Sequence, residues 1–118
     1  MDAKRCRHRM TGAVAALVGA SAVSITVSPS SADGVSSASV VTSDTVTATI
    51  VGGAATSASW VRVSGSASIN ATAPSSETTA FTSVFSSPEA RTASFVYEAV
   101  VNGVTYQSAP VPVNLERT

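Results

Sequence analysis

The segment from Thr45 to Gly53 constrains the fold of this chain more than any other. Its residues, Thr-Val-Thr-Ala-Thr-Ile-Val-Gly-Gly, alternate hydroxyl and apolar side chains up to Ile50. A period of two is typical of a strand with one face in water and the other in a core. The next apolar segment, Ser59 to Gly65, carries the only tryptophan, Trp60. We therefore expect two neighbouring strands of a β-sandwich.

The composition favours strands over helices along the rest of the chain. Thr and Val are abundant, whereas Leu occurs only at Leu17 and Leu115. β-branched residues fit a pleated sheet, and Leu, Lys and Glu would favour helices. The 118 residues suit one domain. Large core residues are few, so we expect a thin core with modest stability or support from a partner. They are Trp60, Phe81, Phe85, Phe95, Tyr97, Tyr106 and three isoleucines.

Turn residues divide the chain from residue 23 onward into nine segments with strand character. Ser36–Val41 and Ala67–Ala71 are weakly marked, so we expect about seven short strands. Ser28 to Gly34 is turn chemistry throughout. Asn102-Gly103 is a strong hairpin signal, because both residues tolerate the positive φ of a type I′ turn. The segments are Val23–Val27, Ser36–Val41, Thr45–Val51, Ser57–Val63, Ala67–Ala71, Thr78–Phe85, Thr92–Val101, Val104–Ser108 and a final one through Val111 and Leu115.

Alternation also predicts the core-facing side chains. They are Val46, Ala48, Ile50, Trp60, Phe81, Phe85, Phe95, Tyr97, Ala99 and Val101. In the tryptophan strand, Val61 and Val63 lie on the opposite face, so either another chain covers that face or a bulge shifts the phase. Trp60 is expected in the core rather than stacked on a sugar ring, whereas Tyr106 is open to either role.

The last predicted strand changes phase at Ala109-Pro110. Pro110 and Pro112 are two residues apart, so the N–H groups they lack would lie on one side of the strand. We therefore expect this half-strand at the edge of a sheet.

No set of residues with catalytic or metal-binding spacing occurs, so we expect no enzyme, no cofactor and no metal. His8 is the only histidine, and the acidic residues are scattered singly over predicted turns and strand faces, as solvated surface charges. Gly52-Gly53 lacks the Lys-Ser/Thr of a phosphate-binding loop. Cys6 is the only cysteine, so an intrachain disulfide is excluded. The Asn70-Ala-Thr72 triplet fits a glycosylation acceptor, a pattern that often arises by chance.

The first 22 residues differ from the predicted sandwich at 23–118. Four cations and Asp2 occupy the first nine positions, whereas acids outnumber cations in the remainder, so a basic tip precedes a weakly acidic body. Residues 10–32 carry no charge, and Gly12 to Val23 is a run of small apolar residues. Without interleaved aromatics the tip is typical of a targeting flank rather than of a nucleic-acid site.

Several interpretations of residues 1–22 remain open. A basic start, an apolar run and the triplet Ala20-Ser21-Ala22 match a secretory signal peptide cleaved after Ala22. The same residues match an assembly arm whose small side chains permit close approach to a larger particle. A retained transmembrane helix would need about 20 mostly apolar residues, which this run supplies poorly. A disordered segment is the fourth interpretation.

Four segments resemble the immunoglobulin-like (BIG-type) domains of bacteriophage virion proteins. The resemblance spans about residues 23–115 and implies an immunoglobulin-like β-sandwich. In related domains an aromatic-x-Cys often stands where this chain has Phe95-x-Tyr97, and Ala48 lies in the partner strand, so a core without a disulfide is implied. The segments are Ser24-Ile-Thr-Val-Ser-Pro-Ser-Ser31, Val46-Thr-Ala-Thr-Ile-Val-Gly-Gly53, Ser59-Trp-Val-Arg-Val-Ser-Gly65 and Ala93-Ser-Phe-Val-Tyr-Glu-Ala-Val-Val-Asn-Gly103.

The resemblance implies a non-enzymatic structural part of a virion, attached to capsid or tail and oligomeric in the assembly, with weak adhesion to cell-surface carbohydrate. Other virion proteins are then the expected partners, and neither nucleic acid nor, unless residues 1–22 form an anchor, a membrane is expected. The alternative is a secreted bacterial immunoglobulin-like surface protein. The candidate docking residues on the arm are Lys4, Arg5, Arg7, Arg9, Leu17 and Val18.

Overall fold

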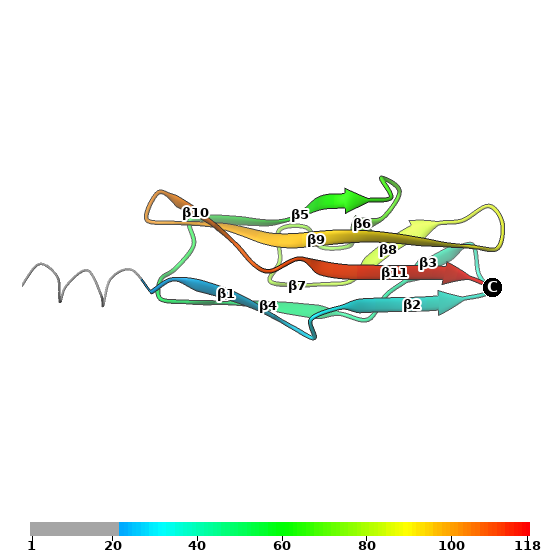
Figure 1. Cartoon of the computed structure of the whole chain (residues 1–118), viewed down its shortest axis with the longest axis horizontal. Helices are drawn as coiled ribbons and strands as arrows, with labels where there is room; N and C mark the ends of the chain where they lie inside the picture. Colours follow the sequence, from blue (N-terminus) through cyan, green and yellow to red (C-terminus); the bar gives the residue numbers. More distant parts are fainter. Residues whose placement is uncertain (1–21) are drawn as a thin grey trace, which may run out of the picture.

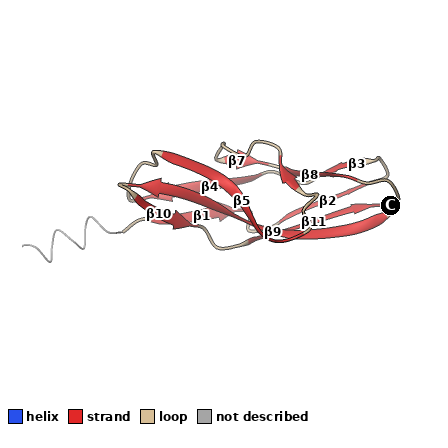
Figure 2. Ribbon diagram, turned by 90° about the horizontal axis from the view of Figure 1, so that it is seen from above, coloured by secondary structure: helices blue, strands red, loops and turns tan. Residues whose placement is uncertain are grey.

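The structure is a computed structural model that describes residues 22–118. These residues form an all-β body with eleven strands and no helix, elongated along the strand direction (Figures 1 and 2). The prediction of an all-β fold is confirmed. The strands are β1 (Ser24–Ser28), β2 (Ala32–Ser36), β3 (Val40–Thr42), β4 (Val46–Val51), β5 (Ser57–Gly65), β6 (Asn70–Ala71), β7 (Thr78–Thr79), β8 (Phe81–Val84), β9 (Glu89–Val101), β10 (Val104–Gln107) and β11 (Val111–Arg117).

One layer of the body consists of two short sheets, β1-β4-β7 and β3-β8-β6. They continue one another along the chain, because β3 leads into β4 and β7 leads into β8. Between them the Ser43 amide donates to the carbonyl oxygen of Phe81 at 2.8 Å. The register then slips by one residue, from Thr42 opposite Thr82 to Val46 opposite Thr79. We treat the two sheets as one interrupted layer, the first layer.

The second layer is built around β9, the longest strand. β5 pairs antiparallel with one edge of β9. Along the other edge, β11 and then β10 pair antiparallel with successive halves of β9. β2 completes this layer by pairing parallel with β11. Because β1 belongs to the first layer and β2 to the second, the chain crosses between layers in the turn after Ser28.

A single aromatic cluster joins the two layers. Phe81 of β8 is fully buried, with its ring centroid 5.8 Å from that of Trp60 and 4.6 Å from that of Phe95. Trp60 in turn lies 5.0 Å from the ring centroid of Tyr97. The residues predicted to face the core are buried, except Ile50, which is partly buried against it. Apolar burial of about 25 cal/mol per Å² over this contact is the main force that holds the layers together.

Two buried serines bridge the strand interruptions. At the β3–β4 junction, the Phe81 amide donates to Ser43 Oγ at 3.0 Å. At the β10–β11 junction, the Tyr97 amide donates to Ser108 Oγ at 2.9 Å, and the Ser108 amide donates back to the Tyr97 carbonyl. In both places a hydroxyl replaces the backbone acceptor that an unbroken strand would supply. The predicted phase change at Ala109-Pro110 is confirmed, and Ser108 is its structural cause.

Replacing Ser108 with alanine should lower the free energy of unfolding by about 1–3 kcal/mol, because the buried Tyr97 amide loses its acceptor. Urea unfolding followed by tryptophan fluorescence measures this change. The matched control is Ser87→Ala on the exposed turn before β9, which should stay within about 0.5 kcal/mol of the parent. Equal effects at the two serines would contradict this role for Ser108.

Two expectations were wrong, one about a turn and one about a sheet edge. Ser28 to Gly34 is not turn throughout, because β2 begins at Ala32, whose side chain is completely buried. The final strand β11 is not an edge strand, because it lies between β9 and β2. Its pairing with β2 starts only at Val113, just after Pro112. Pro110 precedes β11, and Pro112 lies where β11 has β9 as its sole partner, so the edge that the prolines predict is confined to the start of the strand.

The ambiguity in the tryptophan strand is resolved by a bulge. The register of β5 on β9 shifts between Arg62 and Ser64, so Val63 is the extra residue and is 49% exposed. Gly65 ends the strand with φ of 91°, and a Cβ there would meet the Ala93 backbone at 2.5 Å. The hairpin prediction is confirmed as well, since Asn102 and Gly103 both have positive φ.

Candidate functional site

The predicted docking residues cannot be placed. Lys4, Arg5, Arg7, Arg9, Leu17 and Val18 all lie outside the described residues, as does the 1–22 arm except for Ala22. The division of the chain into an arm and a sandwich therefore stays a prediction.

Trp60 is buried in the core. Its side chain is 5% exposed, and its Nε1 donates to the Ser76 carbonyl oxygen at 2.8 Å. No ring face is left for stacking on a sugar. Tyr106 is half-buried and packs against the core cluster. Neither aromatic residue offers an open platform on the described surface.

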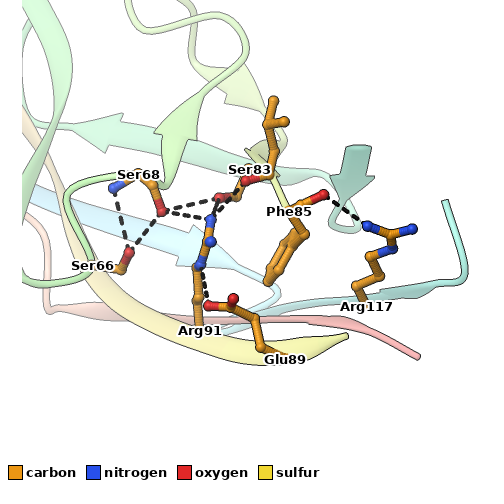
Figure 3. Close-up of polar contacts among 8 residues, drawn as sticks. Ser66, Ser68, Ser83, Phe85, Glu89, Arg91 and Arg117 are labelled. Carbon is orange, nitrogen blue, oxygen red and sulfur yellow. Dashed lines mark hydrogen bonds and ion pairs between the residues drawn. The ribbon is translucent and has the colours of Figure 1, made fainter. Parts of the chain in front are cut away.

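Arg91 forms the densest polar cluster of the described body (Figure 3). Its Nη1 donates to Ser83 Oγ and to the Val84 carbonyl oxygen, both at 2.8 Å, and to Ser68 Oγ at 3.0 Å. Its Nε pairs with the Glu89 carboxylate at 2.8 Å. The guanidinium carbon lies 4.2 Å from the centroid of the Phe85 ring. The Arg91 cluster therefore links β8, β9 and the segment before β6.

A second arginine binds the same region. Arg117 Nη1 donates to the Phe85 carbonyl oxygen at 2.9 Å. Arg91 thus packs on the ring of Phe85, and Arg117 hydrogen-bonds to its backbone. Because the acceptors of Arg91 all belong to this chain, the Arg91 cluster stabilises this end of the sandwich. We assign it a structural role.

Glu77 and Tyr97 share a cleft of about 400 Å³. Tyr97 is 2% exposed, and among the described residues its hydroxyl has no hydrogen-bond partner. The Glu77 carboxylate has no ion-pair partner in residues 22–118, where Arg91 and Glu89 form the pair that is present. The cleft is lined by Ile50, Gly53, Ala54, Ala55, Thr56, Ser57, Ala58, Glu77 and Tyr97.

The electrostatics of this cleft act on the tyrosine. Burial raises the pKa of the Tyr97 hydroxyl above its ordinary value of 10.0, and the negative charge of Glu77 raises this pKa further. The negative charge of Glu77 therefore acts on the Tyr97 hydroxyl, which stays protonated at physiological pH. A protonated phenol beside an unpaired carboxylate supplies one donor and several acceptors to the cleft.

The raised pKa of Tyr97 predicts a loss of stability in alkali. Below about pH 10 both the folded and the unfolded chain keep this proton, so its contribution is complete there. Above that pH the unfolded chain releases the proton first, so stability falls as the pH rises through the folded-state pKa. Unfolding free energies measured across this range should fall less steeply in Tyr97→Phe than in the parent. Parallel curves would contradict the prediction.

The described residues contain no group of three or more His, Cys, Asp or Glu side chains that could hold a metal ion. In the same part of the chain, no helix has the length and apolar character needed to cross a membrane. No protein-family model, curated protein or solved structure matches this chain.

The acidic residues were expected to be solvated surface charges, and Glu77 is exposed. No pattern in the sequence indicated that Glu77 lines a cleft, or that Arg91 and Arg117 hydrogen-bond to groups of the body. Arg91 shares strand parity with Phe95, and Arg117 shares it with Leu115, so both arginines lie on the core-facing side of their strands. A charged residue on the apolar parity was the signal that could have found these two arginines.

Proposed function

We propose that this chain is a non-enzymatic accessory protein of a bacteriophage virion, a capsid- or tail-attached decoration module that adds weak contacts to the host surface. The sequence resemblance is the origin of this proposal. The order in which the strands pair is the observation that carries it further.

The pairing order supports the immunoglobulin-like part of the proposal. With each interrupted strand counted once, the first layer runs β1, β3/β4, β7/β8, β6, and the second runs β5, β9, β10/β11. Lettered in chain order, these are A-B-E-D and C-F-G, the orders of a constant-type immunoglobulin sandwich with seven strands. β2 is then the part of the first strand that joins the opposite layer.

The distribution of charge supports a role in contact rather than in chemistry. The strands of the first layer contain no charged residue, and the charged residues of the strands all belong to the second layer. Threonine pairs cover its outer surface, with hydroxyl oxygens 2.9 Å apart for Thr47 and Thr78 and 3.3 Å apart for Thr42 and Thr82. A neutral face of this kind can pack on another protein without a desolvation cost for charges.

Mass spectrometry of density-purified phage particles from the natural source tests the proposal. We expect the protein in the particle fraction, with peptides that cover Met10 to Val23. Recovery only from the particle-free supernatant, with Val23 as the first residue, would contradict the proposal and favour the secreted surface protein with a cleaved signal peptide.

A further inference from the structure

We propose that the Glu77–Tyr97 cleft is a binding site for a primary ammonium group, with the side chain of a lysine on a partner protein as its occupant. This inference concerns the isolated body and does not depend on the virion role.

The polar groups of the cleft match an ammonium in number and kind. An ammonium has three N–H donors and no acceptor. The lining supplies a carboxylate from Glu77 and hydroxyl oxygens from Tyr97 and Ser57, so acceptors are available on several sides. Thr56 is a further acceptor, because its hydroxyl donates to the Val100 carbonyl oxygen at 3.3 Å and keeps its lone pairs free.

Charge favours a cation over a neutral ligand. The Glu77 carboxylate is unpaired among the described residues, and its charge already acts on the Tyr97 hydroxyl. A bound cation would compensate the Glu77 carboxylate and could donate to a lone pair of the neutral Tyr97 hydroxyl, whereas an anion would be repelled by the carboxylate. A neutral polyol would satisfy hydrogen bonds but would leave the charge uncompensated.

The walls of the cleft suit the stem of a lysine. Ile50 and Ala58 supply apolar surface, and the 53–55 segment of Gly, Ala and Ala presents no bulky side chain. Lysine buries its methylene stem on apolar surface while its ammonium stays at a polar end. The planar guanidinium of arginine would pair bidentately with the Glu77 carboxylate in one plane, and would leave the hydroxyl oxygens on the other sides of the cleft without a donor.

The affinity of one site should be weak, because Glu77 is itself exposed and solvent screens an ion pair at the surface. We expect a dissociation constant on the order of 1 mM or weaker for a free amine. Several copies on one particle would multiply such contacts without any new interaction.

The test is an NMR titration of the full chain with Nα-acetyl-lysine methylamide as the probe. We expect saturable shifts at Tyr97, Ser57 and Ala58 at neutral pH, where the probe carries its full charge. Nα-acetyl-arginine methylamide should bind more weakly. A leucine analogue should not bind.

Two variants separate the site from general effects on the fold. Glu77→Gln keeps the shape of the side chain and should weaken binding about tenfold, while Tyr97→Phe should weaken it less. Glu98→Gln, on an outward-facing position of β9, is the control and should bind as the parent does. Shifts that do not saturate, or binding unchanged in Glu77→Gln, would overturn the proposal.

A neutral sugar that binds the cleft more tightly than the lysine probe would overturn it as well. Methylammonium, which lacks the methylene stem of lysine, tests the source of the ammonium. If it binds as well as the lysine probe, the site recognises the ammonium group alone, and the assignment of a partner's lysine side chain fails.

Discussion

The Phe81→Ala variant should lose about 3–5 kcal/mol of folding free energy, the largest effect of any single substitution proposed for this chain. Phe81 is completely buried, and its ring lies between Trp60 and Phe95 of the opposite layer. Its removal leaves a cavity at the centre of the layer contact. Because small domains are stable by about 5–15 kcal/mol, and this core is thin, the variant should lose a large part of its total stability.

Urea unfolding measures the loss, with the fluorescence of Trp60 as a reporter inside the same cluster. The matched control is Val84→Ala in the same strand, where the side chain is 68% exposed. This variant should stay within about 0.5 kcal/mol of the parent. Similar losses at the two positions would show that Phe81 does not join the layers.

The Arg91→Met variant should lose about 2–4 kcal/mol, although it replaces a charged residue with an apolar one of similar length. The guanidinium donates to Ser83, which is 2% exposed, and a buried group that loses its partner costs about 1–3 kcal/mol. Its bonds to Ser68 and to the Val84 carbonyl oxygen are exposed and add less. The contact with the Phe85 ring is lost too. Thermal unfolding monitored by circular dichroism measures the effect.

Two further variants identify the cause. Arg91→Lys keeps the charge but lacks the fork that reaches several acceptors, so it should recover only part of the loss. Arg62→Met removes an exposed arginine with one hydrogen bond of 3.3 Å, and should cost less than about 1 kcal/mol. If Arg91→Met were as mild as Arg62→Met, the Arg91 cluster would not fasten this end of the sandwich.

The strong alternations were sufficient to predict the central strands. β4 alternates apolar and hydroxyl residues, and its burial follows that alternation. In the second half of β9 the four residues predicted to face the core are buried, although Val96 on the opposite face is buried as well. The Asn102-Gly103 turn was equally predictable, because few residues adopt its backbone conformation. In these segments local preference and tertiary packing agree.

Other elements depend on contacts that no local pattern announces. β2 contains Asp33 and Gly34, residues that favour turns, and it becomes a strand because β11 offers it a parallel partner. A Cβ at Gly34 would lie 2.5 Å from the Thr42 carbonyl oxygen, so glycine is needed there for close approach to β3 rather than for a turn. The roles of Ser43 and Ser108 could not be predicted either, because in sequence they resemble loop serines, and only the structure shows that they accept hydrogen bonds from the amides of Phe81 and Tyr97.

The Glu77–Tyr97 cleft was predictable only in part. Parity places Tyr97 on the core-facing side of β9, whereas Glu77 is an exposed residue just before β7, which lies in the other layer. Their meeting at one cleft depends on the packing of those layers, which the sequence does not encode locally. The 53–58 segment that completes the lining is a loop and the start of β5, where periodicity carries little information.

Backbone NMR of the isotopically labelled protein tests the central claim most directly, namely that the first strand is shared between two layers in an immunoglobulin-like pairing order. We predict contacts of a parallel pair between Gly34 and Leu115, and of an antiparallel pair between Thr26 and Thr49. If Ala32–Ser36 instead paired antiparallel, or showed no contact with β11, the pairing order and the proposal that rests on it would be contradicted.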